Sequence, residues 1–516
     1  MKREMKMYLL LILAVLGFCM TSCTESEDNP VKPEQPVVTD PVAQWLSAIP
    51  GVSDVEIKVR GAETKNPENV YYFCYDQLID HSAPAKGTFK QYAALTYRGI
   101  DAANVLITEG YNMHEDPDSI VDCGFDVNRE ANWINVEYRY FGNSLPEAFH
   151  DFDFNYLNSE QASDDLHAIV SALQKSGRFP KAWISTGVSK SGITTAFYAY
   201  YSEKKGYDDI DLYMPFCAPF CEAVDDPRPG KYIENSNLTH APEAKTKLEA
   251  FAKAILTNAK LCDYLVDYVK AQDPNYVAEL KKAGYTDEDI YWILANYWVS
   301  QNQSMLVGKL SYVPIAMWKD LIPNPEAATA EELAYALKYI NMDDVALLKY
   351  IYDLKKNSGK AGTRITLTDE QLNQLLKARL TNYSFPYYVQ ALRELGSFKL
   401  TFDFLKGVPG FNYEWTEYFS NQSRYNTIYP MYNGNFSNEM TLDFINNFLP
   451  TTQKKMIFVY GGQDHWTGAA IPDPTNPNVK KIIVPGGTHN DWLYNRDYYS
   501  EADCKAIFSQ MNEFLK

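Results

Sequence analysis

The sequence predicts an α/β fold in which a mostly parallel sheet is interrupted by a large helical cap. Three observations support this prediction. Short apolar, β-prone runs occur before residue 217 and again after residue 454, a helical pattern lies between two of the early runs, and the chain from 222 to 431 reads mainly as helices. Strands that alternate with helices are typical of a parallel sheet with crossover helices.

The first group of predicted strands lies at 104–108, 133–136, 182–185 and 211–216. Between the second and third runs, residues 159–175 place apolar side chains at helical spacing. We therefore expect residues 41–221 to form the first part of the sheet domain.

The central region, residues 222–431, is predicted to be the cap. Helical spacing is found at Glu249–Tyr268, Asp289–Val299 and Asp343–Leu354. Two capping boxes, Thr329-x-x-Glu332 and Thr368-x-x-Gln371, are expected to open helices. A cap over the carboxyl ends of the strands would close the cleft and select substrates by size.

The strand pattern resumes at 455–460 and 480–484, so residues 432–516 are expected to complete the sheet domain. Each of these strands is followed by a turn that carries a chemically useful side chain. After the first strand, Gly461–Gln463 form the turn and Asp464 comes next. After the second strand, a Gly-rich turn leads to His489.

The most informative segment is Lys181–Gly192, KAWISTGVSKSG, which reads as a strand, a sharp turn and a helix with Ser189 at the apex. This context makes G-x-S-x-small a candidate nucleophile elbow, in which the strained turn needs small residues two positions to either side. Gly187 meets that need, and Ser191 meets it less well than the usual glycine. The alternative is an ordinary turn serine.

A serine nucleophile needs a base and an orienting carboxylate, and in α/β-hydrolases these follow in the order Ser, acid, His. Asp464 and His489 have that order and context. Asp464 could instead only cap the helix after its strand, and Asp491 is a competing acid that follows no strand of its own. His465 is interpreted as a structural or cleft-lining residue. The sequence thus predicts an α/β-hydrolase core with the triad Ser189, Asp464 and His489.

Composition limits the classes of function. The chain has 516 residues, of which 46% are hydrophobic and 14% aromatic, as in a globular protein with ample core. The formal net charge of −18 argues against nucleic acid as a partner and suits a cationic ligand or simple solubility. We find no zinc motif, phosphate-binding loop or dinucleotide fingerprint, so we expect no cofactor and no metal.

The amino terminus reads as an export signal. Three basic residues precede a short apolar core at Tyr8–Phe18, which is too short to span a bilayer, and Met20–Cys23 resembles the lipobox of bacterial lipoproteins. We expect residues 1–22 to be removed, Cys23 to carry lipid and 23–40 to form a flexible tether. The alternative is an ordinary signal peptide cut near Ser22. The expected location is the cell envelope of a Gram-negative bacterium, either periplasmic or at the surface.

Six cysteines remain beyond the signal segment. They are Cys74, Cys123, Cys217, Cys221, Cys262 and Cys504. An exported compartment permits disulfides, but the sequence leaves their pairing open.

Several segments together carry a family resemblance. They are QLIDH at 77–81, GTFKQY at 87–92, TEGY at 108–111, EYRYFGNSLP at 137–146 and YLNSEQA at 156–162. With the elbow and the loop Gly461–Trp466, they resemble the prolyl tripeptidyl aminopeptidase family of secreted serine peptidases. The lysosomal Pro-Xaa carboxypeptidase and dipeptidyl-peptidase family is related to it. Val188 and Ser191 depart from that family's elbow, G-G-S-K-G-G.

The resemblance implies roles for further residues. It implies the same triad, with the backbone N–H of Lys190 and one near Gly110 or Tyr111 as oxyanion donors. Glu109 and Glu137 become candidate anchors for a substrate amine. For Glu137, a structural ion pair with Arg139 is the alternative.

The function expected from these observations is that of a lipid-anchored serine exopeptidase that acts on peptides. It would release short peptides from free amino termini, with tripeptide products and a proline preference as the resemblance implies. An esterase or acyltransferase with the same triad is one alternative, because fold and triad recur across acyl transfers. A catalytically weak surface lipoprotein that serves as a binding module is another. The oligomeric state stays open.

Overall fold

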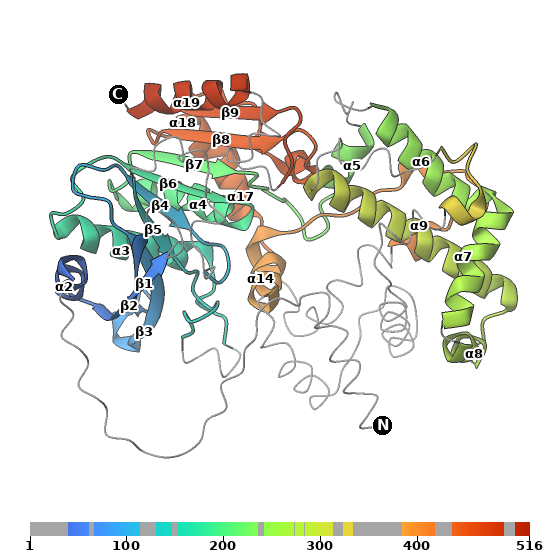
Figure 1. The fold of residues 1–516 in the computed structure, drawn as a ribbon, viewed down its shortest axis with the longest axis horizontal. Helices are drawn as coiled ribbons and strands as arrows, with labels where there is room; N and C mark the ends of the chain where they lie inside the picture. Colours follow the sequence, from blue (N-terminus) through green and yellow to red (C-terminus); the bar gives the residue numbers. More distant parts are fainter. Residues whose placement is uncertain are drawn as a thin grey trace, which may run out of the picture.

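The structure, a computed structural model, places a sheet between layers of helices and a group of further helices to one side (Figure 1). The described residues are 40–60, 67–113, 131–146, 153–235, 242–272, 274–282, 284–312, 324–333, 384–417, 436–489 and 501–515. Cys23, Asp491 and the helices expected near 343–354 and 368–371 lie outside them.

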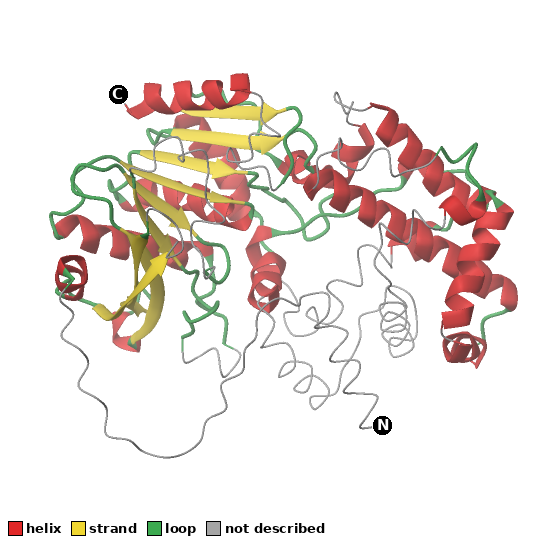
Figure 2. Cartoon of the chain, in the orientation of Figure 1, coloured by secondary structure: helices red, strands yellow, loops and turns green. Residues whose placement is uncertain are grey.

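A single sheet organises the larger part of the molecule (Figure 2). Its strands are β1 (Val52–Arg60), β2 (Glu68–Leu78), β3 (Thr88–Thr96), β4 (Asn104–Thr108), β5 (Asn132–Val136), β6 (Trp183–Val188), β7 (Leu212–Phe216), β8 (Met456–Gly461) and β9 (Val479–Val484). Their order in space is β1-β2-β3-β5-β4-β6-β7-β8-β9. Strands β4 to β9 run parallel to one another. At one edge, β1, β2 and β3 pair antiparallel, and β3 also pairs antiparallel with β5.

The parallel strands are apolar because helices cover both of their faces. Every residue of β4, β5, β6, β7 and β8 is buried. Continuous burial is what a parallel sheet with crossover helices requires. All six predicted strands are present within one to three residues of their expected ends, and the α/β-hydrolase fold class is confirmed.

Helices form a layer on each face. One face packs against α2 (Pro41–Ser47), α3 (Ser159–Lys175) and α4 (Lys190–Lys205). The other packs against α19 (Glu501–Leu515), whose Ile507 and Phe514 join the core formed by β4, β6, β7 and β8. Helix α3 matches its predicted bounds and begins at Asn158, whose side chain accepts from Gln161 N.

The predicted cap region contains helices with a core of their own. They are α5 (Arg228–Asn235), α6 (Pro242–Thr257), α7 (Ala259–Gln272), α8 (Pro274–Lys282) and α9 (Asp287–Tyr312). The helical spacing at 249–268 belongs to two helices, α6 and α7, because the chain breaks at Asn258, whose Oδ1 accepts from Leu261 N and starts a new helix. The Thr329–Glu332 capping box is confirmed by reciprocal hydrogen bonds of 2.9 and 3.2 Å.

The chain returns to the sheet through short helical segments. They are α14 (Ser384–Gln390), η5 (Ala391–Leu395), η6 (Asp403–Leu405), α15 (Tyr413–Glu417), α17 (Glu439–Asp443), η8 (Phe444–Phe448) and α18 (Leu449–Thr451). The short helix η9 (His465–Ala469) lies between β8 and β9. One further turn, η1 (Pro84–Lys86), precedes β3. Asp226 and Phe398 form a parallel bridge that joins the entry and exit of the cap. Within the described ranges, no helix is long and apolar enough to cross a membrane.

Candidate active site

Ser189 stands at the turn between β6 and α4, as expected for a nucleophile elbow. Its backbone has φ 59° and ψ −124°, a conformation that non-glycine residues rarely adopt. The turn is held by hydrogen bonds of 2.9 Å from Ser189 N to Phe216 O and from Ile193 N to Ser189 O. The side chain is half-buried, so it remains accessible from the carboxyl ends of the strands.

The glycines around Ser189 have a steric reason. A Cβ on Gly187 would lie 2.7 Å from the carbonyl carbon of Ser191 and 2.8 Å from its Cβ. A Cβ on Gly192 would lie 2.6 Å from Phe216 O. The elbow therefore tolerates the hydroxymethyl group of Ser191 only because the residue opposite is glycine.

Asp464 both caps a helix and contacts His489. Its Oδ1 accepts from Trp466 N at 3.0 Å and caps η9, while its Oδ2 lies 2.7 Å from Nδ1 of His489. The Asp464 side chain is fully buried and that of His489 is 6% exposed. A buried carboxylate on Nδ1 fixes the ring orientation and leaves Nε2 to act on a partner. His465 is buried next to Phe398 and Trp466, as its structural interpretation expected.

Cys217 is a neighbour of this pair that the sequence did not single out. It follows β7 with a φ of 45°, and its Sγ contacts Thr488 O at 3.7 Å. Among the described residues, Cys217, Asp464 and His489 form a group whose possible ligand atoms lie within 4.8 Å of one another. Since the Asp464–His489 hydrogen bond already uses two of those atoms, a thiophilic metal ion there would compete with that bond.

The loop after β4 packs directly on the elbow. A Cβ on Gly110 would lie 2.8 Å from Ser191 N and 2.9 Å from Lys190 Cβ. The hydroxyl of Thr108 donates to Ser191 O at 2.8 Å, which fastens the end of β4 to the first turn of α4. The three residues expected to form the oxyanion site, Lys190, Gly110 and Tyr111, are thus brought together.

Glu109 is buried beside this loop, with 6% of the residue exposed. Desolvation by burial raises the pKa of Glu109 to about 8, opposed by a hydrogen bond from Asn135. Glu109 lies close to the elbow, and its role as an anchor for a substrate amine stays a prediction.

Glu137 has a structural position. Its carboxylate accepts from Met113 N, Asn143 N and the Ser144 hydroxyl at 2.7 to 2.9 Å. Burial raises its pKa to about 7, and these donors oppose the rise. The expected alternative partner, Arg139, does not contact it. Because three donors of the chain occupy the carboxylate, the arrangement favours a structural role over amine binding.

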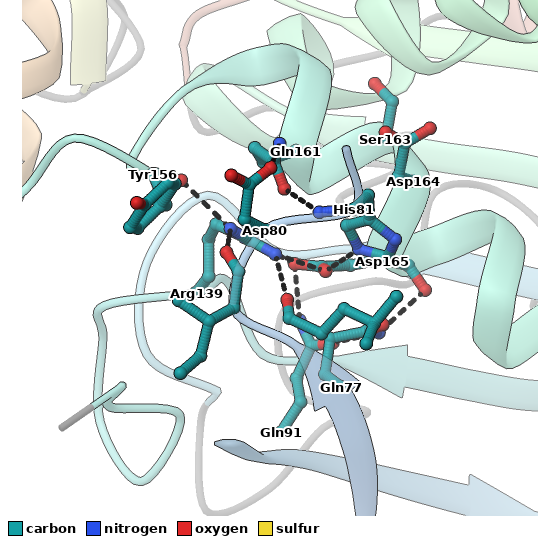
Figure 3. A network of polar contacts seen from close by, with 12 residues as sticks. Gln77, Asp80, His81, Gln91, Arg139, Tyr156, Gln161, Ser163, Asp164 and Asp165 are labelled. Carbon is teal, nitrogen blue, oxygen red and sulfur yellow. Dashed lines mark hydrogen bonds and ion pairs between the residues drawn. The ribbon is translucent and has the colours of Figure 1, made fainter. Parts of the chain in front are cut away.

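Arg139 instead forms a buried bidentate ion pair with Asp165 of α3, at 2.6 and 2.7 Å (Figure 3). The guanidinium also donates to the carbonyls of Leu78, Ile79 and Tyr156. On the other side, the Asp165 carboxylate accepts from His81 Nε2 at 2.8 Å, assuming that nitrogen carries the proton.

This network gathers side chains from four of the motifs that carry the family resemblance. Gln77 and Asp80 from the first motif, Gln91 from the second, Arg139 from the fourth and Gln161 from the fifth all take part. Hydrogen bonds from Lys86 and Ser82 hold the pKa of Asp80 well below its usual range. Through these side chains the four motifs join β2, β3, α3 and the loop after β5.

The cap contacts the loop that carries Asp464. Tyr232 of α5 donates its hydroxyl to Gly462 O at 3.1 Å, and a Cβ on Gly468 would lie 2.4 Å from Arg228 O. Phe398, where the chain leaves the cap, packs against Trp466 with ring centroids 4.8 Å apart. The acid loop is thus held between the two ends of the insertion.

A cavity of about 510 Å³ lies elsewhere, between α9 and α15. It is lined by Trp292, Trp415, Tyr285 and Phe411 among others. None of its lining residues comes from the elbow or the two late loops, so we do not treat it as the peptide cleft.

The model of the family described as PS-10 peptidase S37 matches residues 35–257. The prolyl tri/tetrapeptidyl aminopeptidase of Streptomyces mobaraensis is 25% identical over 462 residues, which cover 86% of this chain and 78% of that protein.

Similar solved structures include a proline iminopeptidase of Mycobacterium smegmatis, at 12% identity and a TM-score of 0.34, covering 82% of this chain and 96% of that one. A cell-wall-degrading esterase, LipA, of Xanthomonas oryzae has 11% identity and a TM-score of 0.32, covering 91% and 100%. The fold assignment rests on the order and direction of the strands in the sheet.

Proposed function

Because this chain is a serine-type peptidase related to the S37 family, we propose that it releases short peptides from free amino termini, with Ser189 as nucleophile, His489 as base and Asp464 as orienting acid. The observation that supports this most is the buried contact between Asp464 and His489, on loops at the same sheet edge as the strained Ser189.

In the first half of the proposed reaction, Ser189 Oγ attacks the scissile carbonyl carbon while its proton passes to His489 Nε2. The carbonyl electron pair moves to the oxygen and forms an oxyanion. When this intermediate collapses, the C–N bond breaks and His489 gives the proton to the leaving amine. The product is a peptidyl ester on Ser189 and a shortened peptide with a new amino terminus.

In the second half, water attacks the ester carbon and gives a proton to His489. Collapse of the second oxyanion breaks the bond to Ser189 Oγ, which recovers the proton from His489. The released short peptide carries the carboxylate. Through both halves, Asp464 stabilises the protonated imidazole.

Two backbone N–H groups are proposed to stabilise the oxyanion. Lys190 N–H stands at the start of α4, where the helix dipole and unpaired N–H groups favour negative charge. The second donor is Tyr111 N–H on the loop packed against the elbow. Preorganised donors of this kind contribute a large share of catalysis in acyl transfer.

The amino-terminal specificity and the proline preference rest on the named relative and on charge. The relative is a prolyl tri/tetrapeptidyl aminopeptidase, and the net charge of −18 suits a cationic peptide end. Glu109 is our candidate anchor, since it lies beside the elbow loop. An ammonium group there would favour the ionised form of Glu109 and lower its raised pKa. Export and a lipid anchor at Cys23 complete the proposal.

The test is a matched set of tripeptidyl chromogenic amides ending in proline, one with a free amine and one acetylated. We expect kcat/KM to be at least about tenfold higher for the free amine, because a charge-assisted hydrogen bond contributes about 1.5–3 kcal/mol. Equal values would contradict the aminopeptidase proposal. Preference for an acetylated peptide with a free carboxylate would indicate a carboxypeptidase.

A short-chain ester of the same chromophore separates peptidase from esterase specificity. We expect the Glu109→Gln variant to lose much of the free-amine preference while it keeps its rate on the acetylated peptide. An unchanged preference would remove Glu109 as the anchor and leave the main proposal standing.

A further inference from the structure

The side chain of Lys190, the residue after the candidate nucleophile, lies in an unusual environment. Lys190 is only 2% exposed, and its Nζ donates to the carbonyl oxygen of Gly110 at 2.5 Å. Three aromatic rings surround the amine, with centroids 3.4 Å (Tyr138), 5.2 Å (Phe141) and 5.6 Å (Tyr111) from Nζ.

Burial of an amine is costly, and nothing about a turn after a strand requires a lysine there. Burial pushes the pKa of Lys190 well below its usual value, and the Glu394 carboxylate opposes this shift. The ring of Tyr138 stabilises the charged form by a cation–π contact. The hydrogen bond to Gly110 does not depend on the charge, since a neutral amine also donates.

The bonded carbonyl belongs to the peptide unit between Gly110 and Tyr111. In a planar trans peptide, the C=O and the following N–H point in opposite directions. Since Gly110 O points at Lys190 Nζ, Tyr111 N–H points away from the buried amine. The next carbonyl, Tyr111 O, accepts from Tyr138 N at 3.2 Å, which fixes the other side of this residue.

We propose that the Lys190 side chain is a positioning residue that orients the second oxyanion donor, Tyr111 N–H, through its hydrogen bond to Gly110 O. Lys190 then serves the oxyanion site twice, with its own backbone N–H as the first donor and with its side chain to aim the second. Donation to Gly110 O also polarises the peptide and strengthens Tyr111 N–H as a donor. This inference rests on the proposed function.

The cap return adds to the same arrangement. Gln390 of α14 donates to the Tyr138 hydroxyl at 2.9 Å and to Glu394 at 2.7 Å. A continuous set of contacts therefore runs from α14 through Tyr138 to Lys190 and Gly110. The orientation of the loop is held from the cap side as well as from the sheet.

The test compares wild type with Lys190→Met, which keeps the stem but removes the donor. Outright loss of an oxyanion donor costs about 10²–10³ in kcat, so misdirecting one should cost about tenfold to a hundredfold, with KM changed less than about threefold. The affinity of a peptide aldehyde, whose adduct carries the oxyanion, should fall by the same factor as kcat/KM. The rate at which a fluorophosphonate labels Ser189 should fall similarly.

Two further variants complete the experiment. Lys190→Gln retains an N–H donor on a shorter stem and should recover part of the lost labelling rate; it also carries the test if Lys190→Met does not fold. Val170→Ala, a core truncation in α3, should lower stability without changing the labelling rate.

The outcomes are distinct. Folded Lys190→Met and Lys190→Gln proteins that are labelled at the wild-type rate would overturn the inference. So would a loss of kcat with unchanged aldehyde affinity, or a rise in KM alone. If wild type itself is not labelled at Ser189, the proposed function fails and not the role of Lys190 alone.

Discussion

Ser189, the candidate nucleophile, has a strained backbone conformation. Its positive φ is maintained because β6, β7 and α4 fix the backbone on both sides, and Gly187 leaves room for Ser191 across the turn. Strained conformations persist where the surrounding structure determines them, often at functional sites.

Gly187→Ala should therefore destroy the elbow. The new Cβ would meet the backbone of Ser191 at 2.7 Å, and overpacking typically costs about 1–3 kcal/mol of stability. Urea unfolding and fluorophosphonate labelling measure both effects, and we expect labelling to be lost. Adding Ser191→Gly should not rescue the variant, because the two nearest atoms, at 2.7 Å, are the backbone carbon and oxygen of Ser191.

Ser185→Ala on the same strand is the control. Its hydroxyl is buried with no hydrogen-bond partner among the described residues, so its removal should be neutral or slightly stabilising. Wild-type labelling of folded Gly187→Ala would show that the steric account of the elbow is wrong.

Glu109 should make stability depend on pH. Burial raises the pKa of Glu109 to about 8 from the usual 4.5, so the folded state binds more protons than the unfolded chain between these pH values. Stability from this group is present below about pH 4.5 and is lost as pH rises through 8. Glu109→Gln removes the titration, so its melting temperature relative to wild type should rise between pH 5 and pH 9.

The exposed Glu326 provides the control, and Glu326→Gln should show no such trend. If the difference between Glu109→Gln and wild type is the same at both pH values, Glu109 is not held protonated by burial.

Among single residues, the sequence predicted the positions that depend on neighbouring residues in the chain. Ser189, Asp464 and His489 each follow a strand, and the comparisons confirm the serine-peptidase resemblance drawn from the motifs. The partners of Glu137 and the aromatic surroundings of Lys190 could not be predicted, since they come from segments distant in the sequence.

At the scale of elements, the Arg139–Asp165 pair ties the loop after β5 to α3 and to the end of β2 (Figure 3). Both side chains are at most 1% exposed. A buried pair of this kind contributes little net stability while intact, but removing one partner leaves an uncompensated charge.

Arg139→Met should destabilise the protein by about 3–5 kcal/mol, because the buried Asp165 carboxylate would lose its bidentate cationic partner. The double variant Arg139→Met/Asp165→Asn should recover part of this loss. Urea unfolding of the two single variants and the double variant gives the coupling energy. Strictly additive effects would mean that the pair does not act as a unit.

The buried strands β4 to β8 were predicted from short apolar runs, and so was the half-exposed β9. Strands β2 and β3 were not predicted, although β2 contains the buried apolar run Val70–Phe73. The edge strand β1 alternates half-buried and exposed residues with a register shift between Ser53 and Glu56, so no apolar run marks it. The helix break at Asn258 depends on one capping side chain within an otherwise helical pattern.

At the scale of the whole molecule, the insertion between β7 and β8 contacts the loop that carries Asp464. Its entry helix α5 and its exit at Phe398 both contact the loop of Asp464, while α14 reaches the surroundings of Lys190. The loops of the candidate active site are therefore held by the helical insertion and the sheet together. The sequence predicted a helical insertion from helical spacing and capping boxes, but these contacts required the tertiary structure.

The amino-terminal segment makes its own prediction about where the molecule resides. If Met20–Cys23 is a lipobox, the mature chain starts at a lipidated Cys23, and its net charge becomes −20 because residues 1–22 carry three bases and one acid. Cys23→Ser should shift the protein from the membrane fraction to a soluble or unprocessed form. An unmodified mature amino terminus by intact mass would contradict the anchor.

The most direct test of the central claim is to trap the acyl-enzyme. Wild-type protein is mixed with a free-amine tripeptidyl ester, quenched in acid within the first turnovers, digested and analysed by mass spectrometry. The account predicts one tripeptidyl adduct on the fragment that contains Ser189, absent from Ser189→Ala and reduced in Asp464→Asn. An adduct on another residue such as Cys217, or undiminished hydrolysis by folded Ser189→Ala, would contradict it.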